Sequence, residues 1–138
     1  MIAMTAGKTV SSEIVPINQL VDERYGSVLC YPRFSTDEAE RRITQLRNLG
    51  VEAVEFTGRK TAFNLLVLGK GKVGIVLTAY TKTRRVALKI RRVDADRKEM
   101  THEVAMLRIA NEIGVGPQLI DGGGDFLLME FVEGMTLS

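Results

Sequence analysis

The sequence predicts an α+β fold in which an antiparallel sheet of five strands carries one main helix, preceded by a small N-terminal α/β extension. Two apolar, β-branched runs, 65–68 and 75–80, flank a glycine-rich segment, and a third such run follows at 86–90. These residue types favour strands, and glycines favour the turns between them. Residues 96–110 repeat apolar side chains at helical spacing, and residues 118–131 are typical of a hairpin.

The composition indicates one folded domain, or one domain with an extension. The chain has 138 residues, of which 45% are hydrophobic, and a net charge of +2. This excludes general disorder and by itself gives no argument for nucleic acid. No apolar run is long enough to span a bilayer, and no signal-peptide core begins the sequence, so we expect a cytoplasmic protein with no membrane partner. The single cysteine, Cys30, cannot form an internal disulfide, and we expect it to be a small buried side chain.

The N-terminal extension, residues 1–60, contains one clear helix signal. Ser35 and Glu38 match a capping box, in which a hydroxyl and a carboxylate three residues apart satisfy free N–H groups. An apolar stripe follows and Gly50 suits the end, which predicts a helix over about 36–49. Arginines lie elsewhere on this helix, so nucleic-acid binding is an alternative to packing on the sheet. The stripe consists of Ala39, Ile43, Leu46 and Leu49, and the arginines are Arg41, Arg42 and Arg47.

One short strand is expected before this helix, over 28–31, ending at Pro32. The segment 51–56 that follows the helix is too little to establish a nucleic-acid-reading winged helix, so packing is the preferred interpretation of the helix. The strand over 86–90 should need cover on both faces, because its alternate residues are apolar in both directions. We expect the capped helix to provide part of that cover. Five basic residues also cluster in the strand region. We expect this cluster to be a solvated face, and the alternative is a surface that binds phosphate or a partner. The cluster consists of Lys82, Arg84, Arg85, Arg91 and Arg92.

The glycine-rich segment reads Gly69-Lys70-Gly71-Lys72-Val73-Gly74-Ile75-Val76. Glycine lets the main chain approach a ligand closely, and successive N–H groups in such a turn can bind phosphate. A dinucleotide-binding motif would open into a helix and a P-loop would end in Gly-Lys-Ser/Thr, whereas here a strand follows and that ending is missing. The pattern G-x-G-x-x-G-x-V followed by V-A-x-K at 86–89 is that of the nucleotide loop and lysine of protein kinases.

Together with the segment 126–134, which is similar to the fifth strand and hinge, these motifs resemble the N-terminal lobe of protein kinases over about residues 62–138. The segments 87–92 and 114–117 are similar to those of the small archaeal Ser/Thr protein kinase-like proteins. The resemblance implies that residues 61–138 form a nucleotide-binding domain. It would be the ATP-binding lobe of a Ser/Thr protein kinase, which transfers the γ-phosphate of ATP to a protein hydroxyl.

The resemblance also assigns roles by motif position. The glycines would cover the phosphates, Val76 and Ala87 would enclose adenine, and Met129 would be the gatekeeper. The carbonyl of Glu130 and the N–H of Val132 would hydrogen-bond the adenine edge. Lysines in the loop depart from the commoner residues and could add phosphate affinity or be solvated. The expected nucleotide contacts are Gly69, Lys70, Gly71, Gly74, Val76, Ala87, Met129, Glu130 and Val132, with Lys72 as the second loop lysine.

Lys89 and Glu103 are the expected catalytic residues of this lobe. By the resemblance Lys89 would bind the α- and β-phosphates, and a helix glutamate would hold it. Glu103 lies in the middle of an apolar stripe, where an unpaired carboxylate is costly, whereas Glu99 lies at its edge. We therefore expect Lys89 to pair with Glu103, and His102, on another helix face, to be a surface residue.

The kinase motifs beyond the hinge are missing, because no H-R-D or D-F-G segment precedes Ser138. We expect ATP and Mg²⁺ as cofactors, with no metal site on this chain and the Mg²⁺ ligands on a C-terminal lobe. The chain alone should be inactive and should self-associate through its open cleft and a free strand edge at 126–132. The alternatives are a non-catalytic nucleotide- or partner-binding module and a nucleic-acid binder, and the protein substrate cannot be inferred.

Overall fold

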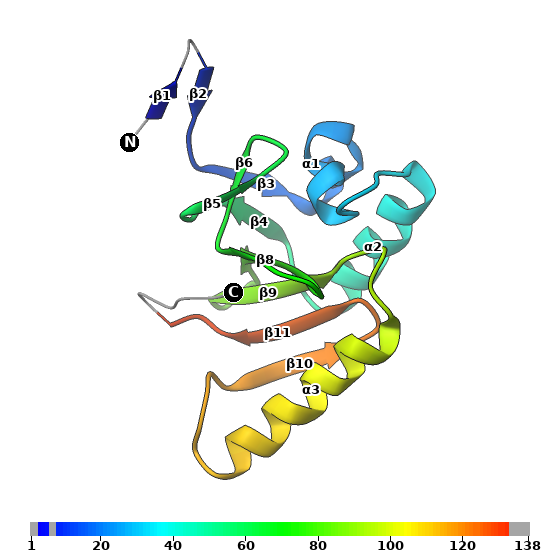
Figure 1. Ribbon diagram of the computed structural model, residues 1–138, viewed down its shortest axis with the longest axis vertical. Helices are drawn as coiled ribbons and strands as arrows, with labels where there is room; N and C mark the ends of the chain where they lie inside the picture. Colours follow the sequence, from blue (N-terminus) through cyan, green and yellow to red (C-terminus); the bar gives the residue numbers. More distant parts are fainter. Residues whose placement is uncertain (1–2, 6–7, 133–138) are drawn as a thin grey trace.

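The computed structural model describes residues 3–5 and 8–132, which form an α+β fold with a mostly antiparallel sheet and three α-helices (Figure 1). The main sheet has the strand order β10-β11-β9-β8-β4-β3, and β7 pairs with β8 beside this path. The strands are β3 (Glu13–Pro16), β4 (Ala53–Phe56), β7 (Gly69–Lys70), β8 (Gly74–Tyr80), β9 (Arg85–Arg91), β10 (Leu119–Gly123) and β11 (Phe126–Glu130).

The sheet has seven strands, not the five predicted, because the N-terminal extension contributes β3 and β4. Val54 of β4 pairs with Ala79 of β8, so the sheet continues across the predicted boundary at residue 60. Two further hairpins lie outside this sheet, β1 (Ala3–Thr5) with β2 (Lys8–Val10), and β5 (Lys60–Ala62) with β6 (Leu65–Val67). The turn between β5 and β6 has positive φ at Phe63 and Asn64, which suits a tight two-residue hairpin.

The three helices are α1 (Glu23–Leu29), α2 (Thr36–Asn48) and α3 (Arg97–Glu112), with a 3-10 helix, η1 (Ile17–Val21), before α1. The predicted strand over 28–31 is wrong, because Val28 and Leu29 end α1. Both residues and Cys30 are buried, and a short apolar run does not distinguish a strand from a buried helical turn. Gly26 lies where α1 meets Phe34, since a Cβ there would lie 2.4 Å from the Phe34 ring.

The predicted helix over 36–49 is confirmed as α2, and it packs on the sheet as expected. The Ser35 hydroxyl accepts a hydrogen bond from the N–H of Glu38 at 3.1 Å, as the capping box requires. The carboxylate of Glu38 binds arginines instead of returning to Ser35. After Asn48 the chain reverses at Gly50, whose φ is +84°.

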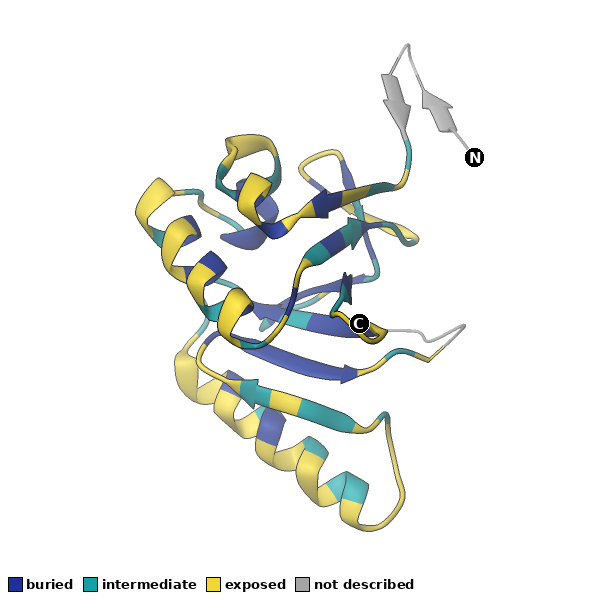
Figure 2. Cartoon of the chain, turned by 180° about the vertical axis from the view of Figure 1, so that it is seen from behind, coloured by how far each residue is buried: buried dark blue, intermediate teal, exposed yellow. Residues whose placement is uncertain are grey.

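The sheet carries one hydrophobic core on each face. The larger core joins α1, α2 and η1 to alternate residues of the central strands, including Leu77, Leu88 and Leu128. The smaller core lies under α3 and contains Val76, Ala87, Met100, Val104, Leu127 and Met129. Figure 2 shows the central strands buried between these layers, while much of the outer surface of α2 and α3 is exposed.

β11 lies between β10 and β9, with Leu127 opposite Lys89, so Phe126–Glu130 is not a free edge and that expectation is wrong. The hairpin predicted over 118–131 is confirmed as β10 and β11. In the described part of the chain, no helix is long and apolar enough to cross a membrane.

Candidate functional site

The predicted pair of Lys89 and Glu103 is present, with Lys89 Nζ 2.5 Å from Glu103 Oε1. Lys89 lies in the middle of β9, where its register partners are Val76 on β8 and Leu127 on β11. The two side chains keep 17% and 29% of their surface exposed. The pair is therefore held by the sheet and by α3, but solvent and small ligands can reach it.

α3 brings Glu103 to Lys89 because its buried residues fix the rotation of the helix. Asp96 caps the helix by accepting a hydrogen bond from the N–H of Lys98 at 2.9 Å. Met100 and Val104, one turn apart, are buried against the sheet, and Glu103, three residues after Met100, lies on the same side of the helix as Met100. Glu99 is exposed, so the choice of Glu103 over Glu99 as the partner is confirmed.

The glycine-rich segment forms a tight turn between β7 and β8. Gly69 pairs with Val76, and Gly71 donates a hydrogen bond to the carbonyl of Gly74 at 3.0 Å. The turn is anchored from the far end of β9, because the N–H of Arg92 donates to the carbonyl of Val73 at 2.7 Å. The predicted strand–turn–strand arrangement is thus confirmed.

Gly74 has a structural reason to be glycine. A Cβ there would lie 2.0 Å from the carbonyl oxygen of Ile90, because β8 and β9 approach closely at this point. Of the two loop lysines, Lys70 donates from Nζ to the carbonyl of Thr61 at 3.1 Å, and Lys72 is exposed. Lys70 is therefore directed toward β5 in this structure.

A cavity of about 370 Å³ lies between the glycine-rich turn and α3. Glu103 belongs to its wall, so the cavity adjoins the pair that Glu103 forms with Lys89. Its lining is mixed in charge and consists of Val73, Asp96, Lys98, Glu99, His102 and Glu103. The described residues contain no group of three or more His, Cys, Asp or Glu side chains placed to hold a metal ion.

The two residues expected to enclose adenine and the expected gatekeeper lie together, but they are covered. Val76, Ala87 and Met129 lie in the core under α3, with exposed fractions of 4%, 0% and 6%. Phe131 packs against this core, and the guanidinium of Arg85 lies 4.1 Å from the centre of its ring. A planar ligand could reach these residues only after a side chain that packs against them, such as that of Phe131, moves.

The two hinge residues lie at the end of β11. The N–H of Glu130 donates to the carbonyl of Gln118 at 2.8 Å, and the side chain of Glu130 is exposed. Val132 is 43% exposed, and the expected hinge residue Gly134 lies outside the described residues. The main chain of this segment is thus fixed at Glu130 and accessible at Val132.

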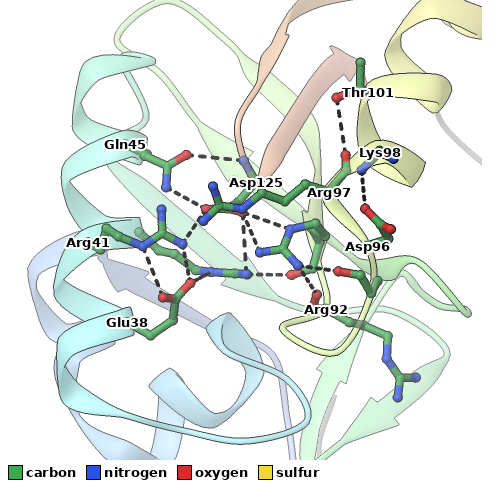
Figure 3. A network of polar contacts seen from close by, with 12 residues as sticks. Glu38, Arg41, Gln45, Arg92, Asp96, Arg97, Lys98, Thr101 and Asp125 are labelled. Atoms are coloured by element: carbon green, nitrogen blue, oxygen red, sulfur yellow. Dashed lines mark hydrogen bonds and ion pairs between the residues drawn. The ribbon is translucent and has the colours of Figure 1, made fainter.

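A second polar site, which the sequence did not indicate, is centred on Asp125 at the turn between β10 and β11 (Figure 3). Asp125 is 1% exposed and accepts hydrogen bonds from Gln45 Nε2 at 2.7 Å, Arg41 Nη2 at 2.8 Å and Arg91 Nε at 2.9 Å. Arg42 Nη2 lies 3.8 Å from the same carboxylate and has no hydrogen-bond partner. We call these residues the Asp125 network, namely Glu38, Arg41, Arg42, Gln45, Arg91 and Asp125.

The network joins three parts of the fold. Arg42 is fully buried in α2 and donates to Glu38 at 2.7 Å and to the carbonyl of Arg91 at 2.5 Å. Arg91, at the end of β9, donates to the carbonyl of Ala95, just before α3, at 2.6 Å. The expectation that Arg91 belongs to a solvated face is therefore wrong, because it is 5% exposed.

One signal for this site was present in the sequence. The expectation that Arg42 lies away from the apolar stripe of α2 is wrong, because Arg42 is three residues after Ala39 and four before Leu46 and is buried with them. A charge on such a stripe must find a partner when it is buried. The partner, Asp125, is 83 positions later in the chain, and no local pattern indicates it.

The charges around Asp125 determine its ionisation. Burial alone would raise the pKa of Asp125, but hydrogen bonds from Gln45 and Arg91 and the charges of Arg42 and Arg41 lower it to about 2. Hydrogen bonds from Arg41 and Arg42 likewise lower the pKa of Glu38 against the effect of burial. Both carboxylates are therefore ionised at neutral pH.

No family model matches this chain, and no curated protein matches it either.

Proposed function

We propose that this chain is the ATP-binding lobe of a Ser/Thr protein kinase, with Lys89 as the residue that binds the α- and β-phosphates. The observation that carries the proposal is the 2.5 Å contact of Lys89 with Glu103 beside a glycine-rich turn. In phosphoryl transfer the protein contributes mainly positioning and charge, and in kinases a strand lysine held by a helix glutamate provides part of both.

The pair leaves Lys89 able to bind a ligand. An ammonium group has three N–H donors, of which Glu103 uses one, so two remain for phosphate oxygens. The main-chain N–H groups of residues 72 and 73 would supply further donors, whereas that of Gly71 already donates to the carbonyl of Gly74. Because the side chain is 17% exposed, phosphate can approach without disrupting the core.

Adenine would bind against Val76 and Ala87 after the cover over them opens. We propose that Phe131, which packs against this core next to the hinge, moves when nucleotide binds. If only a fraction of the molecules has Phe131 in the open position, the apparent affinity for nucleotide equals the intrinsic affinity multiplied by that fraction. Mg²⁺ would enter with the nucleotide and be held outside the described residues.

The proposal is tested by nucleotide binding to the purified chain, measured by isothermal titration calorimetry with ATP and Mg²⁺. Lys89→Ala removes hydrogen bonds to a charged group, so we expect the dissociation constant to rise about tenfold or more. Glu103→Gln should have a smaller effect in the same direction. Lys82→Ala, an exposed lysine in the β8–β9 turn, is the matched control and should bind as the wild type does.

Absence of ATP binding at millimolar concentration, or equal affinities of Lys89→Ala and the wild type, would refute the phosphate site. The burial of Val76, Ala87 and Met129 favours a second candidate, a non-catalytic partner-binding module that uses the same fold. Replacing Phe131 with alanine separates the two, because uncovering the core should strengthen ATP binding only if adenine binds there.

A further inference from the structure

A second cavity, of about 490 Å³, is lined by four arginines that come from four different segments. Arg33 lies between α1 and α2, Arg41 on α2, Arg91 at the end of β9 and Arg97 at the start of α3. In Figure 3 Arg97 extends from α3 back toward the Asp125 network. We call this cavity the four-arginine pocket.

The carboxylates present do not balance these arginines. Arg41 and Arg91 bind Asp125, and Arg41 also binds Glu38. The side chains of Arg33 and Arg97 form no hydrogen bond or ion pair with any described residue. Together with the buried Arg42, five guanidinium groups meet Asp125 and Glu38, an excess of three positive charges, which the charge of Asp94, the ion-pair partner of Arg92, offsets in part at Arg33.

The N-terminal ends of α2 and α3 add to the positive electrostatic potential of the pocket. Ser35, the N-cap of α2, lines the pocket, and Arg97 is the first residue of α3. The partial positive charge of each helix N-terminus is therefore directed to the same region, where it favours an anion.

We propose that the four-arginine pocket binds a phosphate monoester group, at a site separate from Lys89. Guanidinium groups bind phosphate oxygens in pairs of parallel hydrogen bonds, and Arg33 and Arg97 have all their donors available. A dianion offsets most of the excess charge, which a carboxylate would not. The cavity also exceeds the size of one phosphate ion, so it can hold the group while it is attached to a larger molecule.

The test uses inorganic phosphate, with thermal unfolding and isothermal titration calorimetry on the full chain at constant ionic strength. A ligand that binds only the folded state raises the melting temperature, so we expect phosphate to raise it by several degrees relative to chloride. In the double variant Arg33→Gln/Arg97→Gln the shift should disappear and the dissociation constant should rise at least tenfold. Neither side chain has a structural partner, so this variant should fold.

Two matched variants make the result specific. Lys89→Ala and Arg47→Gln, an exposed arginine on α2 that binds Asn18, should keep the full phosphate shift. Loss of the shift in Lys89→Ala would instead place phosphate at the nucleotide site and overturn the proposal. An equal rise of the melting temperature with chloride would also overturn the proposal, because the rise would then come from general screening of charges by salt.

Titration with a phosphoserine peptide, and with its unphosphorylated form as the control, identifies the kind of molecule that carries the phosphate group. Tighter binding of the phosphorylated peptide than of inorganic phosphate would assign the pocket to a phosphorylated protein segment. Equal binding of the two would assign it to small phosphorylated molecules. If neither phosphate nor the phosphopeptide bound at millimolar concentration, the proposal would be wrong.

Discussion

Lys89 and Arg91 lie two residues apart on β9, and each meets one carboxylate, yet the two sites differ in almost every physical respect. Lys89 and Glu103 form a single contact with 17% and 29% of the side chains exposed. The side chains of Arg91 and Asp125 are 6% and 1% exposed, and the carboxylate of Asp125 also binds Arg41 and Gln45. The first pair remains partly exposed to solvent, whereas the second connects the helices to the sheet.

The comparison shows that the burial of an ion pair determines how strongly its loss affects stability. An exposed pair contributes little to stability because water solvates the separated charges nearly as well. A buried pair adds little net stability when complete, but removing one member leaves a charge without compensation. We therefore expect changes at Asp125 to affect folding and changes at Lys89 to affect binding.

The largest effect should follow deletion of residues 1–57, which removes α2 and with it Arg41, Arg42 and Gln45. The core residues Val86, Leu88 and Ile90 would lose the layer that covers them. Since a whole domain is stable by only about 5–15 kcal/mol, the remainder should not unfold cooperatively. Circular dichroism during heating measures this, and an unchanged melting temperature would show that α2 does not stabilise the sheet.

The next largest effect should follow Asp125→Asn, which keeps the shape of the side chain and removes its charge. Arg91 would remain buried without a counter-charge and Arg42 would keep only Glu38, so the free energy of unfolding should fall by about 3–5 kcal/mol. Urea unfolding gives this value. Asp94→Asn, at an exposed ion pair with Arg92, is the control and should leave the midpoint of urea unfolding nearly unchanged.

Stability should also depend on pH through Asp125. Its pKa is about 2 in the folded chain against an ordinary value of 3.8, so the ionised form stabilises the fold above pH 4. This contribution is lost as the pH falls from about 4 to 2 and amounts to about 2 kcal/mol. Subtracting the pH profile of Asp125→Asn isolates it from other carboxylates, and parallel profiles would contradict the assignment.

The smallest effect on stability should be at Lys89 and Glu103. A double-mutant cycle with Lys89→Met and Glu103→Gln should give a coupling energy below about 1 kcal/mol, because both side chains are partly exposed. Urea unfolding of the four proteins measures it. A coupling as large as the loss in Asp125→Asn would remove the contrast between the two sites.

Local patterns were sufficient for the elements near Lys89. The glycine-rich turn, the cap at Ser35 and the apolar phase of α3 each depend on residues close together in the chain. The phase of α3 alone distinguished Glu103 from Glu99 as the partner of Lys89. These features could be predicted because turn chemistry and helical spacing are local.

The features that were missed depend on distant contacts. Val54 of β4 pairs with Ala79 of β8 across an intervening hairpin, and Asp125 docks on Arg41 of α2 from 84 positions away. The strand expected over 28–31 was wrong because four apolar residues fit a buried helical turn equally well. Nor does the sequence show that Phe131 packs against the residues expected to contact adenine.

The separation of Arg41 and Asp125 by 84 positions has a consequence for synthesis of the chain. A ribosome adds about 5–20 residues per second, so about 4–17 s pass between the two residues. Throughout this interval the arginines of α2 lack the carboxylate of Asp125, and the apolar stripe of the helix has no complete sheet to cover. α2 is thus among the first helices to be made and among the last to be fixed in place, and the nascent chain is most exposed to misassembly during that delay.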